Sequence, residues 1–118
     1  MALKSIALVA LGGAIGAVLR YLVGLWLSGD GFPWSTLLVN LVGSLLFGIL
    51  AWIGVEQELF SESIVVFVGI GILGSFTTLS TYSVDSLRLW QEESWGSLCF
   101  YVGTTAIIGP LMALLGWK

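Results

Sequence analysis

The chain has 118 residues, of which 58% are hydrophobic and only 9% are charged, and its formal net charge is −3 at pH 7. Water-soluble domains carry about 25% charged residues, so this composition excludes an ordinary soluble domain and indicates an integral membrane protein. With no histidine and one cysteine, the chain lacks the clusters from which many catalytic and metal centres are built. Its four basic residues form no patch for nucleic acid, and we expect no enzyme activity.

Four apolar stretches follow one another along the chain, and each is long enough to cross a bilayer as a helix. They cover residues 3–27, 35–54, 63–89 and 95–117. The connections between them are short, so we expect one all-α domain, residues 1–118, with four transmembrane helices. The six tryptophans fall near the ends of these stretches, where their rings favour the headgroup region of the membrane.

The first stretch carries Lys4 near its start, ahead of an apolar core, and Arg20 near its far end. A basic residue before an apolar core is also typical of a cleavable signal peptide. The apolar residues that continue after Arg20 favour a transmembrane helix instead. The Arg20 guanidinium either extends to the membrane interface or attracts anions into a vestibule.

The second stretch carries Asn40 on the helical face that it shares with Thr36, Ser44 and Phe47. The carboxamide of asparagine donates two hydrogen bonds and accepts others. Asn40 is therefore a candidate ligand for an anion. The alternative is a purely structural hydrogen bond between helices, which is a common use of asparagine in membranes.

The third stretch is apolar over residues 64–73 and then changes to the run GSFTTLSTYS, residues 74–83, which holds six serines and threonines. Irregular backbone at membrane depth is tolerated only against protein or a polar cavity, so this run predicts a helix broken in mid-membrane. The carbonyls of such a break favour cations and the amides of the next half-helix favour anions. The alternative is that the hydroxyls bond to carbonyls one turn earlier and only bend the helix. Further along, Asp85 either pairs with an arginine or lies at the interface.

The fourth stretch contains Pro110, which predicts a kink. Four spans place both termini on one side, with Lys4 and Lys118 there and Arg88 on the other. This charge difference is small, and positive charge in short loops sets orientation. The chain is therefore predicted to insert in both orientations and to form an antiparallel pair. A topology fixed by a partner or by the insertion machinery is the alternative.

Three segments of the chain resemble the Fluc (CrcB-type) fluoride channel family. They are GGAIGAVLRY at residues 12–21, PWSTLLVN at residues 33–40 and GSFTTLSTYS at residues 74–83. The resemblance implies an antiparallel dual-topology dimer with two fluoride pores in the inner (plasma) membrane of a prokaryotic cell. It also implies a structural sodium ion at the dimer centre, held by the backbone carbonyls of Gly74 and Thr77.

The resemblance further assigns individual side chains to the transport of fluoride. Asn40 is implied to donate to fluoride, Arg20 to line the vestibule, and Ser80 and Thr81 to form part of a polar track. The fluoride path is thus expected to be lined by Asn40, Leu79, Ser80, Thr81 and Tyr82.

Leu79 and Tyr82 occupy the two positions at which the family pattern has phenylalanine, whose electropositive ring edges face an anion. Leucine lacks that edge, and tyrosine keeps it and adds a hydroxyl. The fourth stretch offers Thr104 and Thr105 as the nearest pore hydroxyls. The departures leave two alternatives beside a self-sufficient fluoride channel: a subunit that pairs with a similar chain, or a non-conducting structural partner. A small dual-topology multidrug exporter would also match the length and helix count.

Overall fold

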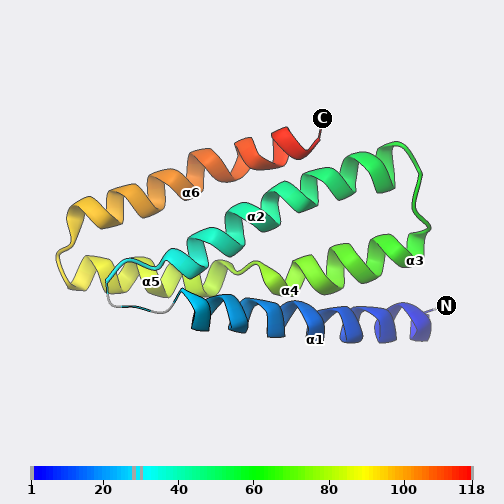
Figure 1. Ribbon diagram of the computed structural model, residues 1–118, viewed down its shortest axis with the longest axis horizontal. Helices are drawn as coiled ribbons and strands as arrows, with labels where there is room; N and C mark the ends of the chain where they lie inside the picture. Colours follow the sequence, from blue (N-terminus) through cyan, green and yellow to red (C-terminus); the bar gives the residue numbers. More distant parts are fainter. Residues whose placement is uncertain (1, 28, 30, 118) are drawn as a thin grey trace.

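The computed structural model describes residues 2–27, 29 and 31–117. All its assigned elements are helices, which follow one another as an up-and-down bundle (Figure 1). In chain order they are α1 (Ala2–Trp26), α2 (Trp34–Leu50), η1 (Ala51–Glu56), α3 (Glu62–Val65), η2 (Val66–Leu73), α4 (Gly74–Phe76), α5 (Leu79–Gln91) and α6 (Trp95–Gly116). The segments η1 and η2 are π-helices that continue α2 and α3.

These elements form four helices that are long and apolar enough to cross a membrane: Ala2–Trp26, Trp34–Gly54, Glu62–Gln91 and Trp95–Gly116. The prediction of four spans is confirmed, and each end lies within two residues of the expected position. Most large apolar side chains point outward, and the buried apolar core is small. This inverted distribution suits a chain whose solvent is lipid, because lipid does not drive apolar groups inward as water does.

Glycines set the distances between the helices. A Cβ atom added to Gly16 of α1 would overlap the Ile72 carbonyl oxygen of η2, and one added to Gly48 of α2 would overlap the Ala113 carbonyl oxygen of α6. Gly116 of α6 packs equally closely on α2. Small residues at such positions let backbones approach and replace the hydrophobic effect with van der Waals contact. Gly16, Gly48 and Gly116 therefore serve packing within this chain.

The third span changes its backbone conformation between α4 and α5, where the ribbon of Figure 1 straightens. Thr77 has φ −86° and ψ 158°, and Thr78 has φ −153° and ψ 125°. Both residues are extended, and the helix resumes at Leu79. The fourth span, in contrast, passes through Pro110 as one assigned helix.

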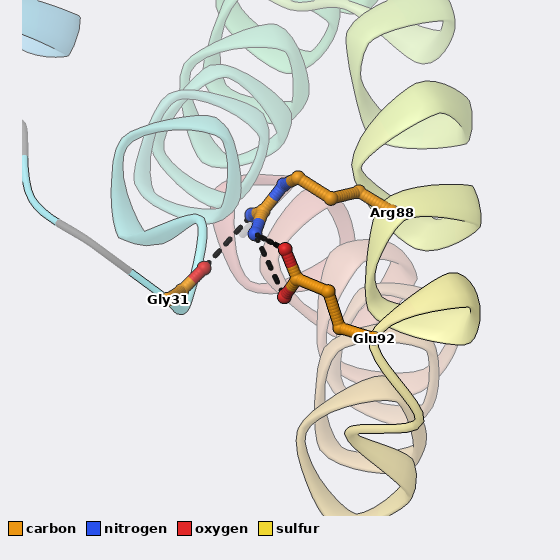
Figure 2. A network of polar contacts seen from close by, with 3 residues as sticks. All are labelled: Gly31, Arg88 and Glu92. Carbon is orange, nitrogen blue, oxygen red and sulfur yellow. Dashed lines mark hydrogen bonds and ion pairs between the residues drawn. The ribbon is translucent and has the colours of Figure 1, made fainter.

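The end of the bundle opposite the termini is tied together by Arg88 of α5 (Figure 2). Its Nη2 donates to the Gly31 carbonyl oxygen at 2.8 Å, and its Nη1 lies 3.3 Å from Oε1 of Glu92. Gly31 adopts φ +90°, which glycine tolerates without steric cost. Exposed ion pairs of this kind contribute at most about 1 kcal/mol, so the contact positions the α1–α2 connection more than it stabilises the fold.

Candidate functional site

The two extended residues between α4 and α5 are held by a side chain of α2. The Asn40 Nδ2 group donates to the Thr78 carbonyl oxygen at 3.1 Å, and the Thr78 amide donates to Asn40 Oδ1 at 2.8 Å. Both groups of the carboxamide therefore bind the backbone of one residue, 38 positions away in the sequence. The structural interpretation of Asn40, a hydrogen bond between helices, describes these contacts.

The threonines of this segment have two different roles. Thr77 Oγ1 donates to the Leu73 carbonyl oxygen at 3.0 Å. This bond to the carbonyl one turn earlier is the kind that often accompanies a bend in a helix. Thr78 Oγ1 instead accepts from the Thr81 amide at 3.2 Å and caps α5. A threonine cap satisfies an amide that has no partner within the helix. The hydroxyl-rich run thus both closes one helix and opens the next.

Arg20 reaches the same segment from α1. Its Nε donates to the Ser75 carbonyl oxygen at 3.0 Å, and its side chain borders a cavity of about 330 Å³. The polar residues that line this cavity are Arg20, Tyr21, Ser35, Thr36, Thr78 and Thr81. A guanidinium partly enclosed by hydroxyl groups favours negative charge, because burial reduces the screening of its field.

A second, open cavity of about 420 Å³ lies beside Asn40. Its lining residues include Asn40 and Ser44 of α2, Leu79 and Tyr82 of α5, and Thr105 and Pro110 of α6. Thr78 lines both cavities, so the residue that Asn40 holds borders each of the two spaces.

The residues expected along the path do not all lie together. Asn40, Leu79 and Tyr82 border the second cavity, and Thr81 borders the first. Ser80 is exposed, with its Oγ 3.4 Å from Thr78 Oγ1. The structure thus places three of the five expected residues at one cavity, one at the other, and Ser80 at neither.

Three further groups were not assigned a definite role by sequence reasoning. Thr105 Oγ1 is buried and has no hydrogen-bond partner within the part of the chain that the structure describes. The Tyr101 hydroxyl donates to Asp85 Oδ2 at 3.2 Å, so the partner of Asp85 is a phenol and not an arginine. Tyr101 also holds the ring of Tyr82, with centroids 5.0 Å apart. Hydropathy has no signal for these contacts, because each joins different helices.

The expected sodium ligands lie at the same change of conformation. Gly74 is exposed, and a Cβ atom there would meet only the Gly69 carbonyl oxygen, at an ordinary 3.5 Å. Thr77 is half-buried. Within residues 2–27, 29 and 31–117, no group of three or more His, Cys, Asp or Glu side chains could hold a metal ion. The candidate cation ligands in this region remain the backbone carbonyls that the resemblance implies.

Comparison with known proteins assigns the chain to a family. The family model described as "CrcB-like protein, Camphor Resistance (CrcB)" matches residues 7–117. A relative named fluoride-specific ion channel FluC from Thermus thermophilus is 41% identical over 121 residues, covering 100% of this chain and 94% of the relative. A FluC from Agrobacterium fabrum is 44% identical, covering 95% of this chain and 92% of the relative. A third, from Shewanella halifaxensis, is 50% identical over 76% of this chain and 74% of its own length. The chain belongs to the CrcB family.

Proposed function

We propose that this chain is a subunit of a fluoride-specific ion channel that lets fluoride leave the cytoplasm passively. The observation that carries the proposal is the pair of cavities that both border Thr78 and are lined by a guanidinium, a carboxamide and several hydroxyls. The names of relatives that match nearly the full length support fluoride as the ion. An inside-negative membrane potential drives anions outward with about 2.3 kcal/mol per charge per 100 mV.

Fluoride is small and strongly hydrated, so a pore has to replace its water with close hydrogen-bond donors while still releasing the ion. One Nδ2–H group of Asn40 donates to the Thr78 carbonyl oxygen, and its second N–H group is the donor for fluoride. Thr81, Tyr82 and Thr105 supply hydroxyls along the cavity walls. Arg20 contributes a positive field at the end of the path.

The working unit is an antiparallel dimer of dual topology. The open cavity beside Asn40 is bounded by one chain only on part of its surface, and Leu79 is 75% exposed there. A second copy in the opposite orientation closes this space, as inverted halves do around the sites of many membrane transport proteins. The small difference in positive charge between the two ends supports insertion in both orientations.

A sodium ion bound by the carbonyls of Gly74 and Thr77 from each subunit completes the proposal. An uninterrupted α-helix would direct the amides of Thr78 and Thr81 at these two carbonyls, four residues earlier. Both amides instead donate to side-chain oxygens. Carbonyls that have lost their helical donors at a helix break suit a cation such as sodium, so the residues present fit the ion.

The proposal is tested by fluoride efflux from liposomes that contain the purified protein and sodium. The wild-type chain should release fluoride and retain chloride. Asn40→Asp should lower the efflux rate at least about a hundred-fold, because a fixed negative charge repels an anion 4 Å away by about 4 kcal/mol at an effective dielectric constant of about 20. Cys99→Ser, at an exposed position on α6, is the matched control and should conduct like the wild type.

The same assay distinguishes the homodimer from a paired assembly. Leu79 in the open cavity favours one second candidate, a subunit that conducts only with a similar partner chain. Efflux that requires co-reconstitution with such a chain would identify that assembly. Absence of fluoride efflux in both preparations would refute the channel proposal.

A further inference from the structure

We infer that Asn40 and Thr78 are positioning residues for the cation site, because their side chains turn two backbone amides away from the carbonyls of Gly74 and Thr77. The inference rests on the sodium ion of the proposed function and explains how this chain makes its ligands available. Neither side chain is itself a ligand in this arrangement. Each acts by accepting a hydrogen bond that a regular helix would give to a carbonyl.

Asn40 acts on the first carbonyl. The Thr78 amide lies four residues after Gly74 and is its regular helical donor. That amide donates to Asn40 Oδ1 at 2.8 Å, which is a short bond for an N–H group. The return bond from Nδ2 to the Thr78 carbonyl fixes the peptide from both sides, so the amide cannot rotate back toward Gly74 without losing two hydrogen bonds.

Thr78 acts on the second carbonyl through its hydroxyl. The Thr81 amide is the regular helical donor to the Thr77 carbonyl, and it donates to Thr78 Oγ1 at 3.2 Å instead. The extended conformation of Thr78, with φ −153° and ψ 125°, is what brings Oγ1 in front of that amide. Asn40 thus holds Thr78, and Thr78 in turn keeps the Thr81 amide away from the Thr77 carbonyl.

The neighbouring carbonyls, those of Leu73 and Ser75, do have hydrogen-bond donors. The Leu73 oxygen accepts from the amide and the hydroxyl of Thr77, and the Ser75 oxygen accepts from Arg20 Nε. Among the described residues, no side chain donates to the carbonyls of Gly74 or Thr77. An unpaired carbonyl away from water costs about 1–3 kcal/mol, so the two diversions are stable when a cation takes the place of the amides.

Substitutions at Asn40 and Thr78 should act on different carbonyls. Removing the Thr78 hydroxyl releases the Thr81 amide to the Thr77 carbonyl and removes one ligand. Removing the Asn40 carboxamide releases the Thr78 amide to Gly74. In both variants sodium binds more weakly, by about ten-fold or more when one carbonyl returns to its helical donor.

The test measures sodium binding by protection against thermal unfolding and does not depend on conduction. A ligand that binds only the folded protein raises its melting temperature as its concentration increases. The purified full-length protein in detergent is heated at a series of sodium concentrations, with N-methylglucamine as the replacement cation. Thr78→Val and Asn40→Leu should shift the protecting sodium concentration upward by about ten-fold or more. Ser86→Ala is the matched control: it also removes a hydroxyl from α5, but one that donates to the Tyr82 carbonyl and accepts no amide.

The outcomes are distinct. A sodium midpoint in Thr78→Val equal to that of Ser86→Ala would overturn the inference even if Asn40→Leu failed to fold. A wild-type protein that sodium protects no better than N-methylglucamine would overturn the sodium site and this inference together. Fluoride efflux in that preparation would leave the channel proposal standing.

Discussion

Leu79 and Tyr82 show how far the role of a single residue follows from its position in a motif. Both line the open cavity beside Asn40, and the resemblance implies that both belong to the fluoride path. Tyr82 is held by the ring of Tyr101 at 5.0 Å, whereas Leu79 is 75% exposed. Within one chain the structure therefore constrains the tyrosine ring and leaves most of the leucine side chain uncovered.

Leu79→Phe should consequently raise the fluoride efflux rate without lowering stability. An aromatic edge contributes about 1 kcal/mol of favourable contact, which corresponds to about a five-fold change in rate. The measurement is liposome efflux together with the melting temperature. Val84→Phe is the matched control, because Val84 is a similarly exposed apolar residue of α5, 65% exposed, and does not line the cavity. Equal efflux from both variants would show that position 79 does not face the ion.

At the scale of elements, the packing of α1 on η2 depends on glycine, and it brings Arg20 within hydrogen-bond distance of Ser75. Gly16 lies against the Ile72 carbonyl oxygen, one turn before Arg20, whose Nε binds Ser75. The π-helical conformation of η2 was not foreseen, since bonding from residue i to i+5 has no simple periodicity in a uniformly apolar segment. The extended residues Thr77 and Thr78 lie inside the hydroxyl-rich run, where hydrogen-bonding side chains compete with the helix.

Gly16→Ala should destabilise the protein by about 1–3 kcal/mol, because the added methyl group forces the two backbones apart. Gly103→Ala on α6 is the control. A Cβ atom there meets nothing within 4 Å, and alanine gains about 1 kcal/mol of helix propensity over glycine. Unfolding by a denaturing detergent should give the highest midpoint for Gly103→Ala, an intermediate one for the wild type and the lowest for Gly16→Ala. A Gly16→Ala midpoint at or above the wild-type value would disprove the close approach.

At the scale of the whole molecule, the bundle is apolar on the outside and nearly balanced in charge between its ends. The end that holds Arg88 (Figure 2) is tied to the α1–α2 connection through Gly31, and the termini lie toward the other end (Figure 1). Orientation then depends on very few positive charges. The proposed dual-topology dimer should correspondingly be sensitive to additional lysines.

Gly29→Lys combined with Gly96→Lys should hold nearly all molecules with the Arg88 end in the cytoplasm. Both glycines have open space around them, so packing is unaffected. The readout is labelling by an impermeant maleimide of a cysteine placed at Ser94 in a Cys99→Ser background. Labelling from outside should fall from about half of the molecules to nearly none, and fluoride efflux should fall with it. Unchanged efflux in a fully oriented preparation would refute the antiparallel dimer.

The sequence by itself determined the four spans, their ends to within two residues and the polar character of the third span. Hydropathy is a local property that adds along the chain, so it can be read without knowing which helices are neighbours. Only the tertiary structure decided that Asn40 holds Thr78, 38 residues away, and that Arg20 reaches Ser75, 55 residues away. In a membrane each polar group needs a protein partner, and the choice among several depends on which helices pack together. The packing thereby decides which backbone carbonyls keep their helical donors.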